Sequence, residues 1–335
     1  MDRINGRRST GASVITGLVR LIVAITDWRM FLIVFGSAAL LALAAQRPLL
    51  YRFQAGVEWG DASDLPFMQG FYPPESVDQA NTWRWSPESA QITVPGIGQR
   101  PLAVDLAIVS HRGIWQPQRT PVTMTLNAGA GSVVIPLRSA PARYKLYVPS
   151  SALRDGVLRL GLRSEPWSNP GDPRSPLGVA VGGSLTVRSL GSAPVWPDFQ
   201  LLGWPLGLGL LWLAVRASKL GPWPTTAVVA GPALVLPLAA LFEIPRLAFG
   251  GRWAVESGLI TLAAALIFAW LTPMILRRFA VPAPARLLPW LVLILSLSFG
   301  LKYTGQLYPD AMPGDLQLHI NRFNLTALGD IYIRA

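Results

Sequence analysis

Long stretches without any charged residue are the feature that most constrains how this chain folds. The five longest apolar stretches of this kind are residues 30–46, 199–215, 220–242, 257–276 and 287–301. A helix that crosses the hydrocarbon core of a bilayer needs about 20 apolar residues, within a range of about 17–25. Four of the stretches follow one another so closely that buried core helices of a soluble domain do not explain them. We therefore predict one N-terminal transmembrane helix and a bundle of four transmembrane helices.

The composition agrees with a membrane protein. Hydrophobic residues make up 51% of the 335 residues and charged residues only 14%, whereas a typical globular domain has about 25% charged residues. The net charge is +11, and 26 of the 29 basic residues are arginine. No nucleic-acid partner is predicted, because a nucleic-acid reader would gather such charge on one face or in a tail. With no cysteine, the chain has no disulfide, thiolate metal site or cysteine nucleophile.

Arginine and lysine beside the apolar stretches predict the orientation in the membrane, because cytoplasmic loops carry an excess of basic residues. In the short turn between the third and fourth stretches, Glu243 and Glu256 offset the charge of Arg246 and Arg252. We therefore expect a multi-pass membrane protein with a cytoplasmic N-terminus and with residues 47–198 and the C-terminal tail outside. The basic residues that set this orientation are Arg3, Arg7, Arg8, Arg20, Arg29, Arg216, Lys219, Arg277, Arg278 and Arg286.

The first apolar stretch has a second interpretation. Ala42-Leu43-Ala44 resembles a signal-peptidase site of small residues, and the stretch has the length of the apolar part of a signal peptide. However, 29 residues precede the stretch, which is long for the basic region of a signal peptide. We favour a retained anchor, and both interpretations export the segment that follows.

The exported segment is predicted to be all-β. Short runs of β-type residues follow one another at close spacing, with turn signals such as Pro95-Gly96 and Asp155-Gly156 between them. The runs are 82–85, 90–94, 102–109, 121–126, 132–137, 143–148, 157–162 and 178–187. Eight short strands predict an antiparallel sandwich or barrel, and we favour a jelly roll because two four-stranded sheets need this number.

Together these features predict a multi-domain membrane protein, in which a jelly-roll-like β-sandwich lies between an N-terminal transmembrane helix and a four-helix transmembrane bundle. The boundaries follow from the apolar stretches. The four regions are a cytoplasmic N-terminus with an anchor (1–46), the extracytoplasmic sandwich (47–198), four transmembrane helices (199–307) and an extracytoplasmic amphipathic tail (308–335).

Aromatic residues in the sandwich are candidates for glycan binding. Trp115 and Trp167 lie in loop-like sequence rich in proline and glycine, whereas Trp83 and Trp85 lie in a predicted strand. Arg174 is a third candidate ligand-binding residue, although Asp172 and Arg174 also suit a structural ion pair that holds a loop. The alternative for every tryptophan is a place in the core, since large aromatic side chains dominate the cores of small domains. His111 is expected to be exposed in a turn at the end of a strand.

Several short motifs of the exported segment resemble a known kind of domain. They are Leu65-Pro66-Phe67-Met68-Gln69-Gly70-Phe71-Tyr72, Trp83-Arg84-Trp85, Val94-Pro95-Gly96 and 172–179 (DPRSPLGV). They resemble the extracytoplasmic β-sandwich of polytopic bacterial envelope proteins, some of which are grouped with membrane glycosyltransferases. The resemblance covers residues 60–190 and implies a role in the cell envelope.

The tail holds the residues best suited to catalysis. Pro313-Gly314 precedes a predicted helix on which Asp315, His319 and Arg322 are spaced i, i+4 and i+7 and so share one face. A carboxylate is able to act as a general base or to bind a divalent cation, and His and Arg neutralise a leaving diphosphate. The structural alternative is that Asp315 caps the helix and that His319 and Arg322 only form its polar face.

The tail also resembles the first external loop of the C-superfamily membrane glycosyltransferases, which use polyprenyl-phosphate sugars. The resemblance implies that Asp310 or Asp315 is the acidic residue of that loop, and that a divalent cation is a possible cofactor. Two departures stand against it: the loop follows the last apolar stretch, and the chain has twelve residues after Phe323. The further membrane helices that build the donor site in that family are missing from this sequence.

Three functions remain open. The first is an inner-membrane envelope protein whose exported sandwich binds glycan or an envelope partner. The second is a glycosyltransferase, or a split subunit of one, that takes a lipid-linked sugar and uses Asp310 or Asp315 with His319 and Arg322. The third is a structural subunit of a membrane complex. The sequence contains no nucleotide-binding glycine motif, no zinc-protease motif and no serine-hydrolase motif, and no metal site is predicted.

Overall fold

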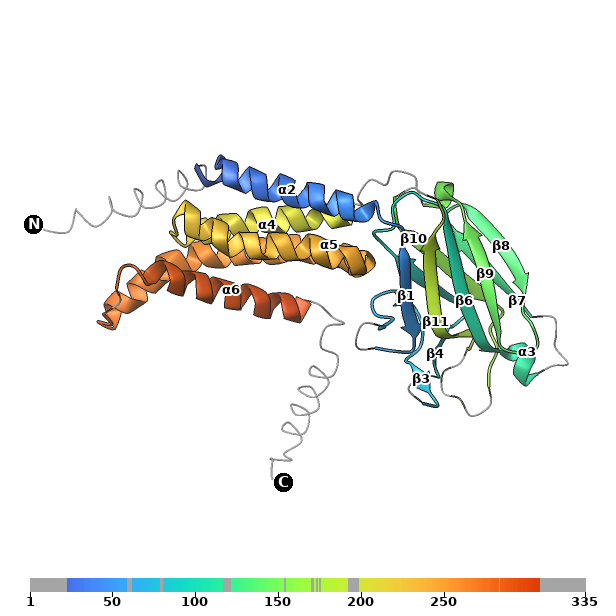
Figure 1. Cartoon of the computed structure of the whole chain (residues 1–335). Helices are drawn as coiled ribbons and strands as arrows, with labels where there is room; N and C mark the ends of the chain where they lie inside the picture. The colour runs from blue at the N-terminus through green and yellow to red at the C-terminus, as the bar shows by residue number, and fades with distance from the viewer. Residues whose placement is uncertain are drawn as a thin grey trace, which may run out of the picture. The chain divides into compact units, whose positions relative to one another are not determined.

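The computed structural model in Figure 1 describes residues 23–58, 62–78, 81–116, 122–153, 155–169, 172, 174, 176–191, 199–282 and 284–307. The chain divides into two compact units. The first consists of residues 1–32, 207–229 and 253–335, and the second of residues 33–206 and 230–252. The second unit contains all the β-strands described, and the candidate site lies there.

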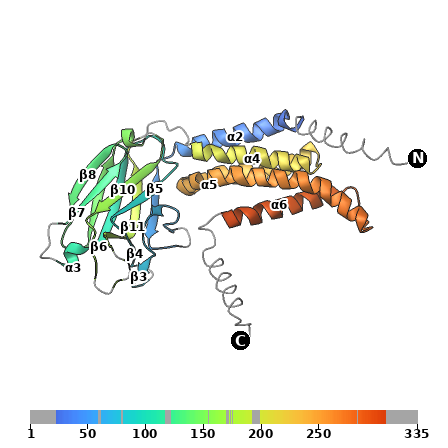
Figure 2. The ribbon, with the colours of Figure 1, turned by 180° about the vertical axis from the view of Figure 1, so that it is seen from behind.

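The β-strands form two antiparallel sheets, which we call sheet A and sheet B (Figures 1 and 2). Sheet A contains β1 (Leu50–Ala55), β3 (Glu75–Ser76), β4 (Thr82–Trp85), β6 (Leu102–His111), β9 (Ala142–Val148) and β11 (Val179–Ser189). Sheet B contains β2 (Met68–Gln69), β5 (Ser89–Val94), β7 (Thr123–Ala128), β8 (Gly131–Pro136) and β10 (Leu158–Ser164). The order in sheet A is β3-β4-β11-β6-β9, with β1 also paired to β11, and the order in sheet B is β2-β5-β10-β7-β8.

The prediction of an antiparallel β region followed by apolar helices is confirmed. Each of the eight predicted β runs is a strand in the structure, β4 to β11, with ends that differ by a few residues at most. The three strands that the sequence did not predict are β1, β2 and β3.

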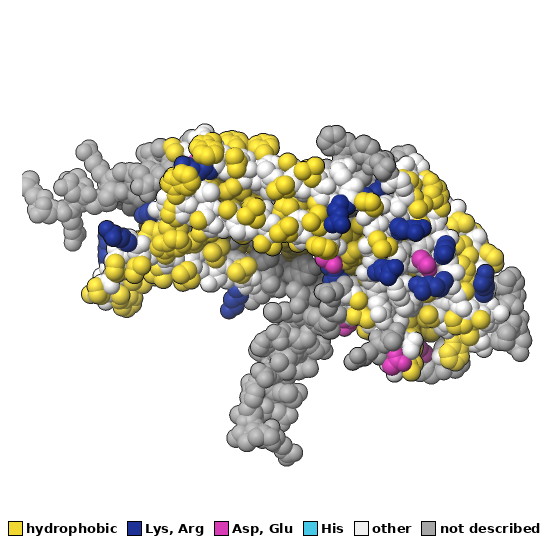
Figure 3. Space-filling view, viewed as in Figure 1, with side chains coloured by type: hydrophobic (Ala, Val, Ile, Leu, Met, Phe, Trp, Pro, Cys, Tyr) yellow, Lys and Arg dark blue, Asp and Glu magenta, His cyan; other side chains and the backbone are white. Residues whose placement is uncertain are grey.

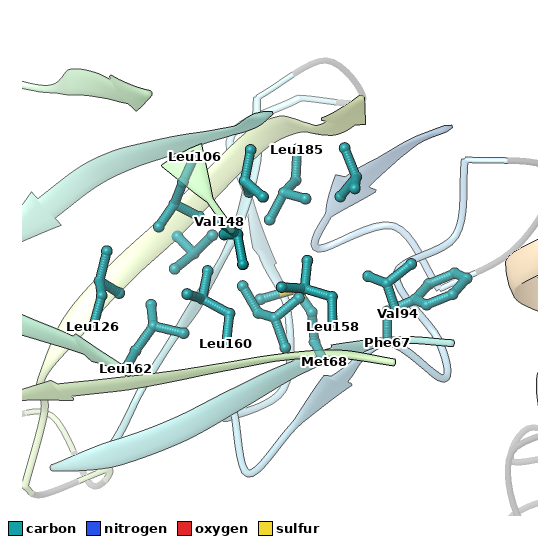
Figure 4. Close-up of a cluster of buried hydrophobic side chains, with 14 of the residues drawn as sticks. Phe67, Met68, Val94, Leu106, Leu126, Val148, Leu158, Leu160, Leu162 and Leu185 are labelled. Atoms are coloured by element: carbon teal, nitrogen blue, oxygen red, sulfur yellow. The ribbon is translucent and has the colours of Figure 1, made fainter. Parts of the chain in front are cut away.

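One apolar core lies between the two sheets (Figure 4). It forms because alternate residues of a strand point to opposite faces of a sheet, so that Leu102, Val104, Leu106 and Ile108 of β6 all point inward and are buried. Sheet B contributes Leu158, Leu160 and Leu162 of β10 in the same way, together with residues of β5 and β7. The opposite faces of both sheets are therefore the outer surfaces of the β domain.

Four of the five α-helices described are long and apolar, and α3 (Arg112–Trp115) is a single turn. The long helices are α2 (Trp28–Ala45), α4 (Phe199–Ala217), α5 (Pro222–Arg278) and α6 (Leu288–Leu307), and a short 3₁₀ helix spans Ser150–Ala152. By length and composition, α2 and α5 are long and apolar enough to cross a membrane, and shorter apolar segments lie within α4 and α6. Helices of this kind also occur as signal sequences or in the cores of soluble proteins.

Helix α5 corrects one detail of the prediction. The sequence predicts a turn that contains Arg246 and Arg252, but both residues are helical, and Glu243 (φ −125°, ψ 35°) is where the helix breaks. Pro245 lies two residues after the break and contributes to it, because proline lacks an N–H and its ring clashes with the carbonyl four residues earlier, which kinks or breaks a helix. The third and fourth apolar stretches thus belong to two helical segments joined at Glu243.

Polar contacts within the second unit join the β domain to helix ends. Arg100 is buried at the C-terminal end of α2, where its Nη1 donates to the carbonyl oxygen of Arg47 at 2.7 Å and its Nη2 to that of Ala45 at 3.2 Å. Next to the break in α5, the Tyr51 hydroxyl donates to Glu243 at 3.2 Å and accepts from Arg246 Nε at 2.9 Å. Burial raises the pKa of the Tyr51 hydroxyl, which keeps it protonated as a donor.

Candidate ligand-binding face

The outer face of sheet A carries four tryptophans around small residues. In the register of the sheet, Trp85 lies opposite Ala180, and Ala180 lies opposite Ser110 on the next strand. Residues paired across strands point to the same side of a sheet, so these three side chains form one row on the outer face. In the neighbouring row, Glu75 pairs with Trp83, and Trp83 pairs with Gly182.

Two of the tryptophans form the base of this face. The rings of Trp85 and Trp167 meet edge to face with centroids 6.1 Å apart, and each side chain is 6% exposed. Trp167 is held by reciprocal backbone hydrogen bonds with Leu177 and by its indole N–H, which donates to the carbonyl oxygen of Gly178 at 3.3 Å. Trp167, predicted as a binding platform, is therefore part of a small second core, and its ring is closed to a ligand.

Trp115 is presented to solvent at the end of the Trp85 row. It is 60% exposed, and its indole N–H donates to the Ser110 hydroxyl at 2.8 Å. The short helix α3 positions it: the His111 ring accepts a hydrogen bond from the Gly113 N–H at 3.0 Å at the start of the helix. A Cβ on Gly113 would lie only 2.9 Å from the His111 ring, so this tight turn needs glycine. Of the two tryptophans that the sequence singled out, Trp115 is thus the accessible one.

His111 corrects a second prediction. The sequence predicts an exposed histidine, but His111 is 2% exposed, because its pairing with the buried Val179 directs it inward. Its Nε2 lies 2.8 Å from the carbonyl oxygen of Arg138, and its Nδ1 accepts from Gly113. Both ring nitrogens are used in this way, so the histidine shapes the turn below Trp115.

Arg174 lies in an ion-pair network at the β3 edge of the same face. Its Nε and Nη2 donate to the Asp172 carboxylate at 2.9 Å and 2.7 Å, and its Nη1 contacts Glu75. The Trp83 indole N–H donates to the other oxygen of Glu75 at 3.0 Å. The structure thus contains the ion pair that the sequence suggested and adds Glu75 to it.

The network affects the charges of its members. Hydrogen bonds from the Arg174 side chain and backbone N–H hold the pKa of Asp172 below its ordinary value, and the Asp172 and Glu75 carboxylates raise the pKa of Arg174. Both groups are therefore charged at neutral pH. The sequence did not indicate Glu75, because a strand of two residues leaves too short a pattern to detect.

A groove between the sheets is a further feature that the sequence did not indicate. It has a volume of about 590 Å³ and lies where the edge strands β8 and β9 leave the core partly open. Val133, Ile135, Leu146 and Tyr147 are among its mostly apolar wall residues. Ser132, Lys145 and Ser151 also line it.

The predicted catalytic residues Asp310, Asp315, His319 and Arg322 lie outside the described residues, and their roles stay predictions. Within the described ranges, no group of three or more His, Asp or Glu side chains is arranged to hold a metal ion. The structure therefore describes candidate residues only for ligand binding: Trp115, Trp83, Glu75, Asp172 and Arg174.

Comparisons with known proteins assign no family to this chain. No family model matches it, and no curated protein matches it. Among solved structures, it is similar to BtGH115A, a family GH115 4-O-methyl-α-glucuronidase with specificity for decorated arabinogalactans, at 11% identity over 44% of this chain and 17% of that chain, with a TM-score of 0.24. It is also similar to the CBM51-2 and INT domains of Clostridium perfringens ZmpB in complex with GlcNAc, at 10% identity over 64% of this chain and 42% of that chain, with a TM-score of 0.21.

The chain spans less than half the length of either of these structures. TM-scores this low carry no argument about fold or ligand.

Proposed function

We propose that this chain is an integral protein of the bacterial cytoplasmic membrane whose exported β domain binds glycan at the face around Trp115. The regions of the proposal are the anchor (1–46), the exported domain (47–198), the membrane helices (199–307) and the exported tail (308–335). The observation that carries glycan binding is the exposed, hydrogen-bonded indole of Trp115 on a face that also holds Glu75 and Arg174.

The surfaces of the helices support a place in the membrane. Large apolar side chains point outward along α2 and along both segments of α5, where a soluble protein would carry charge. In Figure 3 these helices are covered with hydrophobic side chains. Exposed examples are Leu32, Phe35, Leu43, Leu234, Leu238, Phe242, Ile267 and Trp270.

The strand order supports a jelly roll. Strands β4, β11, β6 and β9 are neighbours in one sheet, and β5, β10, β7 and β8 are neighbours in the other. Most successive strands from β4 to β11 therefore change sheet, as expected where an eight-stranded ribbon folds over into two sheets. Such a fold turns its outer faces and its loops to solvent, which leaves both available for binding.

The chemistry of the Trp115 face suits a sugar ring. An indole ring offers a rigid flat surface at low entropic cost, and a few placed polar groups give orientation. The Ser110 hydroxyl fixes the Trp115 ring by one hydrogen bond, and the carboxylates of Glu75 and Asp172 are acceptors for sugar hydroxyls beside the half-buried Trp83.

Glycan binding is tested with the full chain in lipid nanodiscs on an array of bacterial envelope glycans. We expect the Trp115→Ala variant to lose about tenfold or more in affinity for the bound glycans, as for a buried aromatic anchor of a complex. The matched control is Tyr147→Ala, which removes another exposed ring on sheet A, 67% exposed and paired with Ala103 at the far end of β6. Equal affinity in the Trp115→Ala variant, or no glycan bound by the wild type, would contradict the proposal.

The orientation has a separate test. Because the chain has no cysteine, single cysteines can be introduced at exposed positions and labelled with a membrane-impermeant maleimide in intact cells. We expect labelling at Ser132→Cys in the β domain and none at Val281→Cys after α5 until the cells are opened. Labelling at both positions in intact cells would refute the proposed topology.

The tail supports a second candidate, a glycosyltransferase or a split subunit of one, through the shared spacing of Asp315, His319 and Arg322. This candidate predicts that Asp315→Asn abolishes sugar transfer from a polyprenyl-phosphate donor in membranes. Unchanged transfer would leave glycan binding as the sole proposed function.

A further inference from the structure

A second part of the outer face of sheet A, separate from the tryptophans, is strongly basic. In the register of the sheet, Arg52 pairs with Thr186, Thr186 with Asp105, and Asp105 with Lys145. In the next row toward the end of β11, Arg188 lies between Leu50 and Ala103. We call Arg52, Arg143, Lys145 and Arg188 the basic face; all four side chains are exposed. Figure 3, seen from the side of Figure 1, shows dark blue side chains gathered over this sheet.

Most of this positive charge is not compensated. Arg143 donates from Nε to Asp105 at 3.1 Å and from Nη2 to the carbonyl oxygen of Ser184 at 2.6 Å, so it uses the one acidic residue of the rows. Within the described part of the chain, no ion pair involves Arg52, Lys145 or Arg188. The exported segment, with 14 basic and 11 acidic residues, has a net charge of +3. Counted together with Asp105, the four residues of the basic face also carry a net charge of +3, so the rest of the segment is balanced and the excess is concentrated here.

The side chains directly between these cations are small, whereas two large exposed side chains, Leu50 and Tyr147, lie at the two ends of the Arg188 row. Thr186 and Asp105 separate Arg52 from Lys145, and Ala103 and Ser184 lie in the rows on either side. Neighbouring strands are about 4.8 Å apart, so the backbones at Arg52 and Lys145, three strands apart, are separated by about 14 Å. Arg188 lies one row away, about 7 Å along the strand. Three cations are thus spread over an area that an extended anionic chain can cross.

We infer that the basic face binds an acidic polysaccharide, with Arg52, Lys145 and Arg188 contacting carboxylate groups on successive sugars. Arginine is suited to this because its planar guanidinium binds carboxylate through two parallel hydrogen bonds. The threonine and serine hydroxyls and the small side chains between the cations admit a chain rich in hydroxyl groups. The inference goes beyond the proposed function, because it uses a different surface and a different ligand class from the Trp115 face.

The composition of the face favours a polysaccharide over two other anionic partners. An interface for a protein has a core of large apolar or aromatic residues packed together; on this face Arg188 and Ala103 separate Leu50 from Tyr147, so the two form no such core. A surface that docks on anionic lipid combines basic residues with a continuous apolar face that enters the bilayer, and two separated side chains do not make one. Charges spread among small side chains match a polymer whose charges repeat along its length.

The test uses the full chain in nanodiscs of zwitterionic lipid and polygalacturonate, an acidic polysaccharide. Its fully methyl-esterified form is the matched ligand, because it keeps the sugar chain and removes the charge. We expect polygalacturonate to bind in about 50 mM salt and to weaken as salt rises to about 300 mM, because exposed charges are screened. The variant Arg52→Glu/Lys145→Glu/Arg188→Glu should bind about tenfold or more weakly, and the esterified polymer should not depend on these residues.

Two controls distinguish binding at the basic face from binding elsewhere on the β domain. Arg163→Glu changes an exposed arginine of sheet B and should leave polygalacturonate binding within about twofold. Trp115→Ala should also leave polygalacturonate binding unchanged. A failure of glycan binding at Trp115 and a failure of polygalacturonate binding at the basic face therefore give different results. Should the triple charge reversal not fold, Arg52→Gln/Lys145→Gln removes charge without adding any and should still weaken binding several-fold.

The inference is overturned by any of three results. The first is that wild-type protein does not bind polygalacturonate at low salt. The second is that the triple variant binds it as well as wild type does. The third is that polyglutamate or phosphatidylglycerol vesicles bind through these residues while polygalacturonate does not, which would identify a protein or membrane surface instead.

Discussion

The two outer faces of the β domain use the same residue types in opposite ways. On sheet B, Arg159 is paired with Asp155, and Arg163 donates to Glu88 at 2.7 Å, so each exposed arginine has a carboxylate beside it. On sheet A, Arg52, Lys145 and Arg188 line a face whose one carboxylate in those rows is used by Arg143. Exposed ion pairs add little to stability. The difference between the faces is therefore one of surface charge: the arginines of sheet B are paired with carboxylates, and sheet A presents cations that are unpaired among the residues described.

The faces also differ in how they are covered. On sheet A, Trp85 and Trp167 pack over Ala180 and beside Gly178. Position 178 needs glycine, because a Cβ there would lie 2.2 Å from the Pro87 carbonyl oxygen. No aromatic cluster of this kind covers sheet B among the described residues. Sheet A thus combines a packed aromatic base with the exposed Trp115 and the basic face, and sheet B serves mainly to close the core.

The largest expected effect tests the aromatic base. Trp167→Ala removes a ring that is 6% exposed and should lower the free energy of unfolding by about 3–5 kcal/mol, as for other buried aromatic residues. Trp115→Ala removes the same side chain from a 60% exposed position and should change the free energy by less than about 0.5 kcal/mol. Thermal unfolding of the β domain, followed by near-ultraviolet circular dichroism, measures both. Similar melting of the two variants would show that Trp167 is not a core residue.

These tryptophans show where prediction from sequence succeeds and fails. The strands β4 to β11 were predictable because each is an alternating run bounded by turn residues. Trp115 and Trp167 lie in equally loop-like sequence, yet only one is exposed. The burial of Trp167 depends on Trp85 and Leu177, which meet it from other parts of the chain. Local pattern holds no information about such contacts.

The strands that were missed have the same cause. β2 and β3 have two residues each, too few for a period, and exist because β5 and β4 pair with them. β1 pairs along its whole length with β11, which lies far away in the sequence. The basic face was missed for a related reason: Arg52, Lys145 and Arg188 are far apart in sequence, and the register of sheet A alone brings them together.

The second prediction gives the cations of sheet A a neighbouring carboxylate, as the arginines of sheet B have. Thr186 lies between Arg52 and Asp105 in register, so Thr186→Glu places a carboxylate among the cations of the basic face. We expect polygalacturonate binding to weaken about fivefold, with little change in stability, because an exposed charge changes stability by at most about 1 kcal/mol. The matched control is Thr125→Glu on sheet B, opposite Arg163. Equal weakening in both variants would mean that net charge, and not the basic face, determines binding.

The third prediction leaves the arginines of sheet B without carboxylates, as most cations of the basic face are among the described residues. The double variant Glu88→Gln/Asp155→Asn removes the carboxylates from Arg163 and Arg159. We expect a second, weaker site for polygalacturonate, visible as increased stoichiometry in calorimetry. The free energy of unfolding should fall by no more than about 1 kcal/mol for each pair. Unchanged stoichiometry would show that two cations on a sheet face are not sufficient, which would sharpen the requirement for the three on sheet A.

The smallest expected effect concerns the ion-pair network at the β3 edge of sheet A, formed by Arg174, Asp172 and Glu75. The pKa of Asp172 is lowered in the folded protein, so its ionised form is favoured by folding. Its contribution to stability is therefore complete at pH values above the unfolded pKa, about 3.9 for an aspartate, and is lost as the pH falls through the lower folded pKa. The melting temperature of Asp172→Asn should accordingly lie slightly below that of wild type at pH 7, and the difference should vanish in strong acid. A difference that persists there would assign the effect to the shape of the loop, and the ion pair would then have no part in stabilising the edge of the face beside Trp83.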